Sequence, residues 1–216
     1  AIKLAKKAGM NFRQVVTGEE IQFDPNGEDN QRGLAGAVAL YHVAAAAARA
    51  GKTLDEVAAI AQKYADNMAS ITVKSTDATH PQNGASFGDL GETDLMEVGA
   101  GQHGEGGGIR MPMMSAKETV ALVAEPLCRK LGLTAGDKAF VMINGCGATT
   151  MMEMLVLFKD TVEFLQAKGV EVVGNMVGEI LTVQEAAGFQ MNIAKWDEET
   201  LALWNTPCHT PAYSKE

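Results

Sequence analysis

The sequence predicts an α/β protein, α+β in part, in which helices cover sheets. Segments with helical periodicity alternate with short apolar segments of strand type along most of the chain, and this alternation is typical of helices packed on a sheet. The chain has 216 residues, of which 46% are hydrophobic and 21% are charged, close to the globular average. A chain of this length can form one large or two small domains with sizeable cores.

The chain opens on a short helix that Gly9 ends, followed by a predicted strand at 12–17. These residues look like the second half of a strand–helix–strand unit, so we expect that an N-terminal segment is missing. The polar, turn-rich segment 18–33 leads into an apolar helix at 34–50, with Gly51 as its stop. This helix is apolar nearly all round, which predicts that it is buried on most sides.

A second helix follows at once and is the clearest in the sequence. Thr53 and Glu56 form a capping box, and apolar residues then recur at helical spacing as far as Met68. The apolar segment 70–73 predicts a strand. The segment 76–92 is rich in Gly, Asp, Asn, Ser and Pro, which predicts an exposed connection.

A short predicted strand at 95–98 leads directly into the glycine-rich segment 99–108, which has six glycines in ten positions. So many glycines permit positive φ angles and let a ligand approach the backbone closely. Ser115 and Glu118 form another capping box, and the helix that they open contains Pro126. We expect this proline to kink or restart the helix.

The remainder alternates strands with helices and ends in a tail that contains two prolines. The predicted strands are 138–143, 170–173, 176–182 and 189–194, and the predicted helices are 151–167 and 197–204. We expect two domains: residues 1–92 form the remainder of an N-terminal α/β domain, and residues 93–216 form a second α/β domain that carries the glycine-rich loop.

Charge and cysteine content exclude several classes of function. The chain has 18 Lys and Arg against 27 Asp and Glu, a formal net charge of −9, and only 6% aromatic residues. The negative field repels phosphate backbones and anionic membrane surfaces, so neither nucleic acid nor a membrane is an expected partner. No apolar run is long enough to span a bilayer. Cys128, Cys146 and Cys208 are widely spaced, with no Cys-x-x-Cys pair, which favours a reduced, cytoplasmic protein.

His103 is the most informative residue for chemistry. A histidine within a glycine-rich loop at a strand end has little bulk around its ring, so it can meet a ligand as nucleophile, general base or metal ligand. A turn histidine without a role is the equal alternative. Glu105 could orient the ring or a substrate hydroxyl, or be a solvated carboxylate. The loop lacks the Lys-Ser/Thr of a P-loop, so it is a weak candidate for nucleotide binding.

Other polar residues have structural interpretations at least as good as functional ones. The segment 144–150 is a turn whose amides could face a ligand at the strand ends, or simply a close-packed turn. His42 lies within an apolar helix, which favours a core or interface histidine over a catalytic one. Cys208 and His209, even together with Cys146, lack metal-ligand spacing, so no metal site is predicted.

The segment 97–107, Glu-Val-Gly-Ala-Gly-Gln-His-Gly-Glu-Gly-Gly, resembles the Gly-x-His-Gly-Glu-Pro-Gly motif of the dihydroxyacetone-binding subunit of dihydroxyacetone kinase, the DhaK or DAK1 family. Further matching segments, in the same order as in the family, are 32–36, 142–149 and 199–212. Gly106 replaces the motif proline, and Cys146 stands where the family usually has leucine. The family's N-terminal third, with a second histidine, a lysine and an aspartate that help to bind and activate the substrate, has no counterpart in this chain.

The resemblance implies that His103 adds to the ketone carbon of dihydroxyacetone and forms a covalent hemiaminal, with Gly104 and Glu105 in the substrate site and no metal. It implies no cofactor on this chain, with ATP or ADP and magnesium on a separate nucleotide-binding subunit. A phosphotransferase-system protein could then supply the phosphoryl group. The missing N-terminal segment would leave a sheet edge and apolar helix faces uncovered. A separately encoded N-terminal polypeptide, or a second copy of this chain as in a homodimer, could cover them.

Three interpretations follow from these residues. The leading one is a subunit that presents dihydroxyacetone, or another short ketose such as erythrulose, for phosphorylation. The second is a regulatory paralogue that binds the ketose, or merely retains the fold, without catalysis. The third, an unrelated glycine-loop α/β protein, would require the matching segments to be coincidence.

Overall fold

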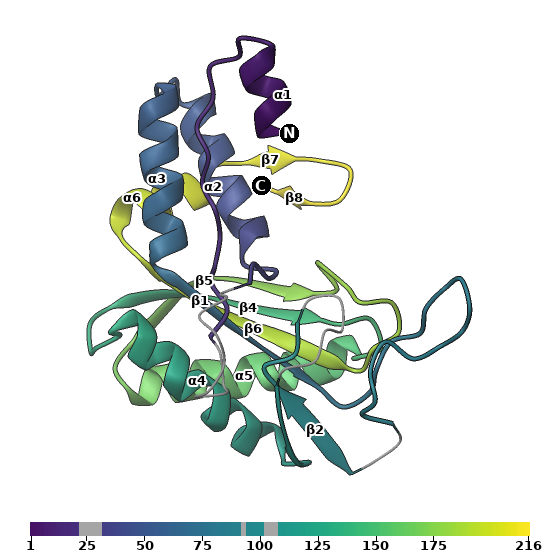
Figure 1. Ribbon diagram of the computed structural model, residues 1–216. Coiled ribbons are helices and arrows are strands. Elements are labelled where there is room, and N and C mark those ends of the chain that lie inside the picture. Colours follow the sequence, from purple (N-terminus) through teal and green to yellow (C-terminus); the bar gives the residue numbers. More distant parts are fainter. Residues whose placement is uncertain (22–31, 92–93, 102–107) are drawn as a thin grey trace.

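A six-stranded sheet forms the middle layer of the molecule, with helices on both of its faces (Figure 1). The computed structural model describes residues 1–21, 32–91, 94–101 and 108–216. The strands follow the order β3-β2-β1-β6-β4-β5 across the sheet. Their bounds are β1 Met68–Lys74, β2 Leu95–Val98, β3 Ile109–Pro112, β4 Lys138–Gly145, β5 Glu171–Gly178 and β6 Gly188–Trp196. The predicted α/β class, with helices covering a sheet, is confirmed.

The helices fall into two groups, one on each side of the sheet (Figure 1). On one side lie α2 Ala37–Arg49, α3 Leu54–Asp66 and α6 Glu198–Trp204, with α1 Ile2–Lys7 at the far end. On the other side lie α4 Ala116–Leu131 and α5 Met151–Ala167. A small hairpin of β7 Cys208–His209 and β8 Ser214–Lys215 lies beside α2, outside the main sheet.

Strand β6 is central and pairs antiparallel with both β1 and β4, whereas β5 adds to β4 in parallel. Because side chains alternate across a strand, β4 serves two cores. Phe140 and Met142 pack toward α2, α3 and α6, together with Trp196 and Trp204. Their neighbours in β4, such as Val141, pack toward α4 and α5.

The helix starts that the sequence predicts from capping boxes are confirmed. Thr53 and Glu56 cap α3, and Ser115 and Glu118 cap α4, each through reciprocal side-chain and backbone hydrogen bonds. A third box, which was not predicted, opens α5 at Thr150. Each box satisfies backbone N–H groups that a helix start would otherwise leave without a partner.

The predicted strand at 12–17 is wrong. These residues form no strand and run along the helices instead, where Arg13 forms an ion pair of 2.6 Å with Asp55 of α3. The chain reaches the sheet only at Glu20, in an isolated parallel bridge to Ser70 of β1. Val15 packs against the core formed by the helices on this side of the sheet, whereas Val16 is 67% exposed.

Two further boundaries differ from the prediction. The strands expected at 170–173 and 176–182 are one strand, β5, which runs through Gly174. A side chain at Gly174 would lie 2.8 Å from the ring of Trp196, so this glycine permits close packing and does not make a turn. Helix α4 also continues through Pro126 without restarting. Pro126 lies on its partly exposed side, where water can satisfy the carbonyl that loses its partner.

Helix α2 begins three residues after the predicted start and is buried along one face only, since Tyr41 is 65% exposed. The strands β3, β7 and β8 were not predicted. The domain boundary expected between residues 92 and 93 stays a prediction, and strands from both sides of it share one sheet. Within the described residues, no helix combines the length and apolar character that crossing a membrane requires.

Candidate functional site

The predicted site residues His103, Gly104 and Glu105 lie outside the described residues. What the structure describes is the frame that carries them: β2 leads into the loop and β3 follows it, and Val98 pairs with Ile109 across this hairpin. The two stems of the loop, at Gly99 and Gly108, therefore start from adjacent points at one end of the strand pair. The residues between these stems are therefore attached to a two-stranded base.

A row of alternating charges crosses the three strands below this loop. Lys74 of β1 lies opposite Glu97 of β2, and Glu97 lies opposite Arg110 of β3. The Lys74 Nζ atom is 3.7 Å from a Glu97 carboxylate oxygen, and the Arg110 Nε atom is 3.9 Å from the same oxygen. Directly opposed residues of opposite charge stabilise neighbouring strands. This row ties the loop-bearing hairpin to the body of the sheet.

Lys74, Asp77 and Glu97 form a buried charged cluster, with side chains 4%, 5% and 3% exposed. The Lys74 Nζ atom donates to Asp77 Oδ1 at 2.6 Å, and the backbone N–H of Leu90 donates to Asp77 Oδ2 at 2.7 Å. Burial alone would raise the pKa of Asp77, but these hydrogen bonds outweigh it and lower the pKa. Asp77 is therefore ionised in the folded protein at neutral pH.

Glu97 also holds the second stem of the loop, since its Oε1 atom accepts from the backbone N–H of Gly108 at 3.3 Å. A side chain at Gly108 would place its Cβ atom 2.4 Å from the carbonyl oxygen of Val98. Only glycine allows the backbone to approach this closely. The second stem is thus fixed by one charged hydrogen bond and by close backbone packing.

The first stem is held by a second ion pair. Arg32 binds Glu20 through two hydrogen bonds of 2.6 and 2.5 Å, and its Nη2 atom also donates to the carbonyl of Gly99 at 3.1 Å. The Glu20 side chain is 1% exposed. A bidentate arginine–carboxylate pair has a defined geometry, so Arg32 presents a fixed donor to the loop. Both stems are therefore fastened by buried carboxylates and their cationic partners.

The turn at 144–150 is a close-packed connection between β4 and α5. The backbone N–H groups of Cys146 and Ala148 donate to the carbonyls of Gly188 and Ala186 at 3.0 and 3.1 Å. Asn144 accepts from the N–H groups of Ile180 and Leu181. Because these two N–H groups already donate to neighbouring backbone carbonyls, they favour a close-packed turn over a ligand-binding one. Burial, chiefly, raises the pKa of Cys146 to about 12, which disfavours the thiolate form that acts as a nucleophile.

Sequence reasoning missed the residues that hold the loop. Arg32 appeared only as part of a family segment, and Lys74, Asp77 and Glu97 had no assigned role. The one sequence signal was a single charged residue in each of two strands that otherwise carry no charge, Lys74 as the last residue of β1 and Glu97 within β2. No group of three or more His, Cys, Asp or Glu side chains suited to a metal ion occurs within the described ranges.

Fold and site together define a mixed α/β protein in which a glycine-rich, histidine-containing loop joins two strands at one side of the sheet. Comparison with known proteins then identifies the family to which the chain belongs. The chain belongs to the Dak1 domain family, whose model matches residues 1–212. The predicted resemblance to the dihydroxyacetone-binding subunit family is thereby confirmed.

Curated relatives match over nearly the whole chain. The dihydroxyacetone-binding subunit DhaK of phosphotransferase-system-dependent dihydroxyacetone kinase 1 from Listeria innocua is 34% identical over 99% of this chain and 65% of its own length. The corresponding Escherichia coli subunit is 28% identical over 98% of this chain and 66% of its own length. An L-erythrulose kinase from Pectobacterium atrosepticum is 30% identical over 96% of this chain and 36% of its own length. The chain thus spans roughly two thirds of the length of the DhaK subunits that it matches.

Solved structures share the fold. The dihydroxyacetone kinase operon co-activator DhaQ superposes with a TM-score of 0.89 at 24% identity, over 95% of this chain and 64% of the other. The native dihydroxyacetone kinase of C. freundii gives a TM-score of 0.81 at 23% identity, over 95% of this chain and 37% of the other.

Proposed function

We propose that this chain is the dihydroxyacetone-binding part of a kinase, and that it presents dihydroxyacetone for phosphorylation to dihydroxyacetone phosphate by a separate nucleotide-binding subunit. The observation that carries the proposal is the frame of the His103 loop. In a member of the Dak1 family, both stems of this loop are fastened by buried charged residues, as expected of a loop that must hold a reactive side chain in place.

In the proposed reaction, the unprotonated ring nitrogen of His103 attacks the ketone carbon of dihydroxyacetone. The carbonyl π electrons move to oxygen, which gains a proton, while the other ring nitrogen loses one, so the product is a neutral hemiaminal. A terminal hydroxyl of the bound ketose then accepts the phosphoryl group. Glycerol has no electrophilic carbon, so the covalent bond selects the ketone. Gly104 and Glu105 contact the substrate in this proposal.

The proposed complex divides the chemistry between chains. This chain binds no cofactor, and ATP or ADP with magnesium is held by the nucleotide-binding subunit, which a phosphotransferase-system protein can recharge. A homodimer, or a separately encoded N-terminal polypeptide, completes the substrate site. The expected setting is the cytoplasm, with neither nucleic acid nor a membrane as partner.

Native mass spectrometry of the chain with dihydroxyacetone tests the proposal. We expect a mass increase of one ketose molecule, absent with glycerol and absent in His103→Ala. His80→Ala is the matched control, because it removes a histidine outside the glycine-rich segment, whose ring contacts that of Phe87 with 3.8 Å between ring centroids. Covalent binding by His103→Ala at the wild-type level would refute the proposal.

A second candidate substrate is erythrulose, because a relative that covers nearly the whole chain at 30% identity is named L-erythrulose kinase. The same measurement with erythrulose in place of dihydroxyacetone ranks the two ketoses by the fraction of adduct formed. Adding a nucleotide-binding subunit with ATP and magnesium then separates a kinase from a regulatory ketose-binding protein. Phosphorylated ketose supports the kinase, and an adduct that is never phosphorylated supports the regulator.

A further inference from the structure

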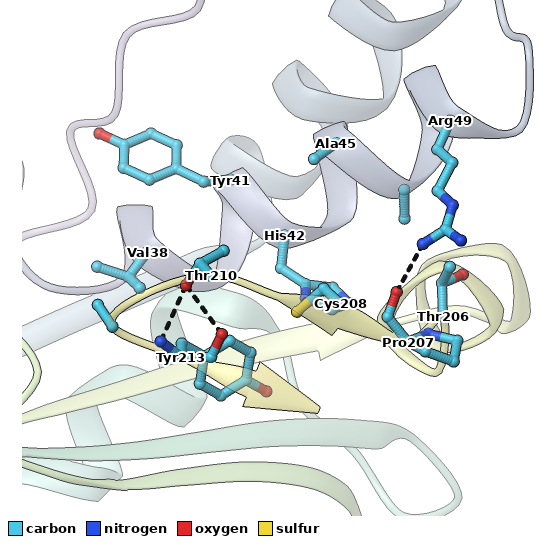
Figure 2. A pocket seen from close by; sticks show the side chains of 12 residues that line it. Val38, Tyr41, His42, Ala45, Arg49, Thr206, Pro207, Cys208, Thr210 and Tyr213 are labelled. Carbon is cyan, nitrogen blue, oxygen red and sulfur yellow. Dashed lines mark hydrogen bonds between the residues drawn. The ribbon is translucent and has the colours of Figure 1, made fainter. Parts of the chain in front are cut away.

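A cavity of about 390 Å³ lies between α2 and the β7–β8 hairpin, outside the main sheet (Figure 2). Its volume falls within the range of small-molecule sites. Most of its wall is apolar and comes from side chains such as Val38, Ala45, Pro207 and Tyr213. Such a lining suits an organic ligand of low polarity.

The cavity wall also carries a thiol and an imidazole in contact. The Sγ atom of Cys208 lies 3.2 Å from Nδ1 of His42. Both side chains are half-buried, so the thiol remains accessible from the cavity. A cysteine with a histidine nitrogen in hydrogen-bond reach is the arrangement by which proteins activate a thiol nucleophile.

The surroundings of His42 keep its ring neutral. Burial, chiefly, and the positive charge of Lys215 lower the pKa of His42, against a smaller opposing effect of nearby backbone carbonyls such as that of Trp204. In a neutral ring one nitrogen carries the proton and the other accepts. With the proton on Nε2, Nδ1 is free to accept the proton of the Cys208 thiol. His42 is then a general base, not a second cation.

Arg49 is the one charged side chain among the described residues that line the cavity. It lies at one end of the cavity, where its Nη1 atom donates to the carbonyl of Pro207 at 3.0 Å (Figure 2). A guanidinium has five donors, so others can face a carbonyl oxygen of a ligand. The site therefore offers an apolar wall, a nucleophile with its base, and a cation for a developing negative charge.

We propose that Cys208 and His42 form a second ligand site, which binds a small apolar compound with an α,β-unsaturated carbonyl group and adds covalently to it. The Cys208 thiol passes its proton to His42 Nδ1 as sulfur bonds to the β-carbon, and the alkene electrons move into the enolate. The imidazolium returns the proton to the α-carbon. No group leaves and no oxidant or co-reactant is consumed, so the adduct has the summed mass of the protein and the ligand.

Alkylation by N-phenylmaleimide, followed by peptide mass spectrometry, tests this site. We expect Cys208 to react at least tenfold faster than Cys128 and Cys146, which are buried and have pKa values raised, chiefly by burial, to about 11 and 12. Its rate should saturate with reagent concentration, because the reagent binds before it reacts. A linear dependence with the rate constant of glutathione would overturn the proposal.

Two variants test separately the role of His42 as a base and the role of the cavity in binding the reagent. His42→Asn should slow the alkylation of Cys208 by about 10²-fold or more, in line with the loss of a general base, and an unchanged rate would refute the role of His42. Ala45→Phe places a ring at the cavity wall and should abolish saturation. Ala48→Phe is the matched control, because Ala48 is exposed on the same helix but does not line the cavity. Equal effects of the two phenylalanines would contradict the binding step.

Discussion

Replacing Lys74 by Met removes the cation of the buried cluster and keeps a side chain of similar length. In the protein, Lys74 lies 2.6 Å from a carboxylate oxygen of Asp77 and 3.7 Å from one of Glu97. Without it, two carboxylates share a site from which water is excluded. Breaking a buried ion pair by removing one partner costs about 3–5 kcal/mol, and we expect Lys74→Met to lower the free energy of unfolding at pH 7 by that amount.

The effect should depend on pH in a defined direction. In the wild type the folded-state pKa of Asp77 is lowered, so its contribution to stability is present above the unfolded value of about 3.9 and is lost as the pH falls through the folded value. In Lys74→Met the burial of Asp77 dominates and raises its folded-state pKa. Protonation of Asp77 then stabilises the variant. The difference in the free energy of unfolding between the wild type and the variant should therefore narrow as the pH falls from 7 to 5.

Urea unfolding followed by circular dichroism at both pH values measures this gap. Lys159→Met is the matched control, because Lys159 also forms ion pairs but is 64% exposed, and exposed pairs contribute about 0–1 kcal/mol. A Lys74→Met effect no larger than that of the control, or a gap that stays constant with pH, would show that the buried cluster does not hold the loop frame.

Three further outcomes are expected. Gly108→Ala should abolish the dihydroxyacetone adduct in native mass spectrometry, because its Cβ atom would lie 2.4 Å from a backbone oxygen; normal adduct formation would contradict the assigned close packing. Arg32→Met should destabilise the chain in urea by about 3–5 kcal/mol, the cost of leaving the buried carboxylate of Glu20 without its cation, and a neutral effect would argue against the stem contact. Thr150→Ala should cost about 1 kcal/mol through the lost cap of α5, with the midpoint of urea unfolding as the readout and an unchanged midpoint as the contrary result.

The fold was predictable wherever a local signal decides the structure. Capping boxes located the starts of α3 and α4, and helical periodicity located α5 without error. Prediction failed where the outcome depends on what lies beside a segment. Residues 12–17 have the pattern of a strand but meet helices, and Gly174 looks like a break but packs under Trp196. Nothing within a few residues of these positions specifies such neighbours.

The candidate site shows the same division. Glycine content and one histidine indicated the loop, because those signals lie within ten consecutive residues. The charged row below it comes from three strands, and Lys74, Glu97 and Arg110 meet only because the register of β1, β2 and β3 sets them opposite one another. Without that register, each is an isolated charge in the sequence.

The register and the charged row depend on each other. A shift of one residue between β1 and β2 would set Lys74 opposite Val98 or Met96 and turn every β2 side chain to the other face. Lys74 and Glu97, both nearly fully buried, would then lose their mutual ion pair, and the cost of unpaired buried charge would oppose the shift. The row therefore selects one register for the hairpin. Because the loop stems at Gly99 and Gly108 leave from that hairpin, the same charges that fix the strands also fix the point from which His103 is carried.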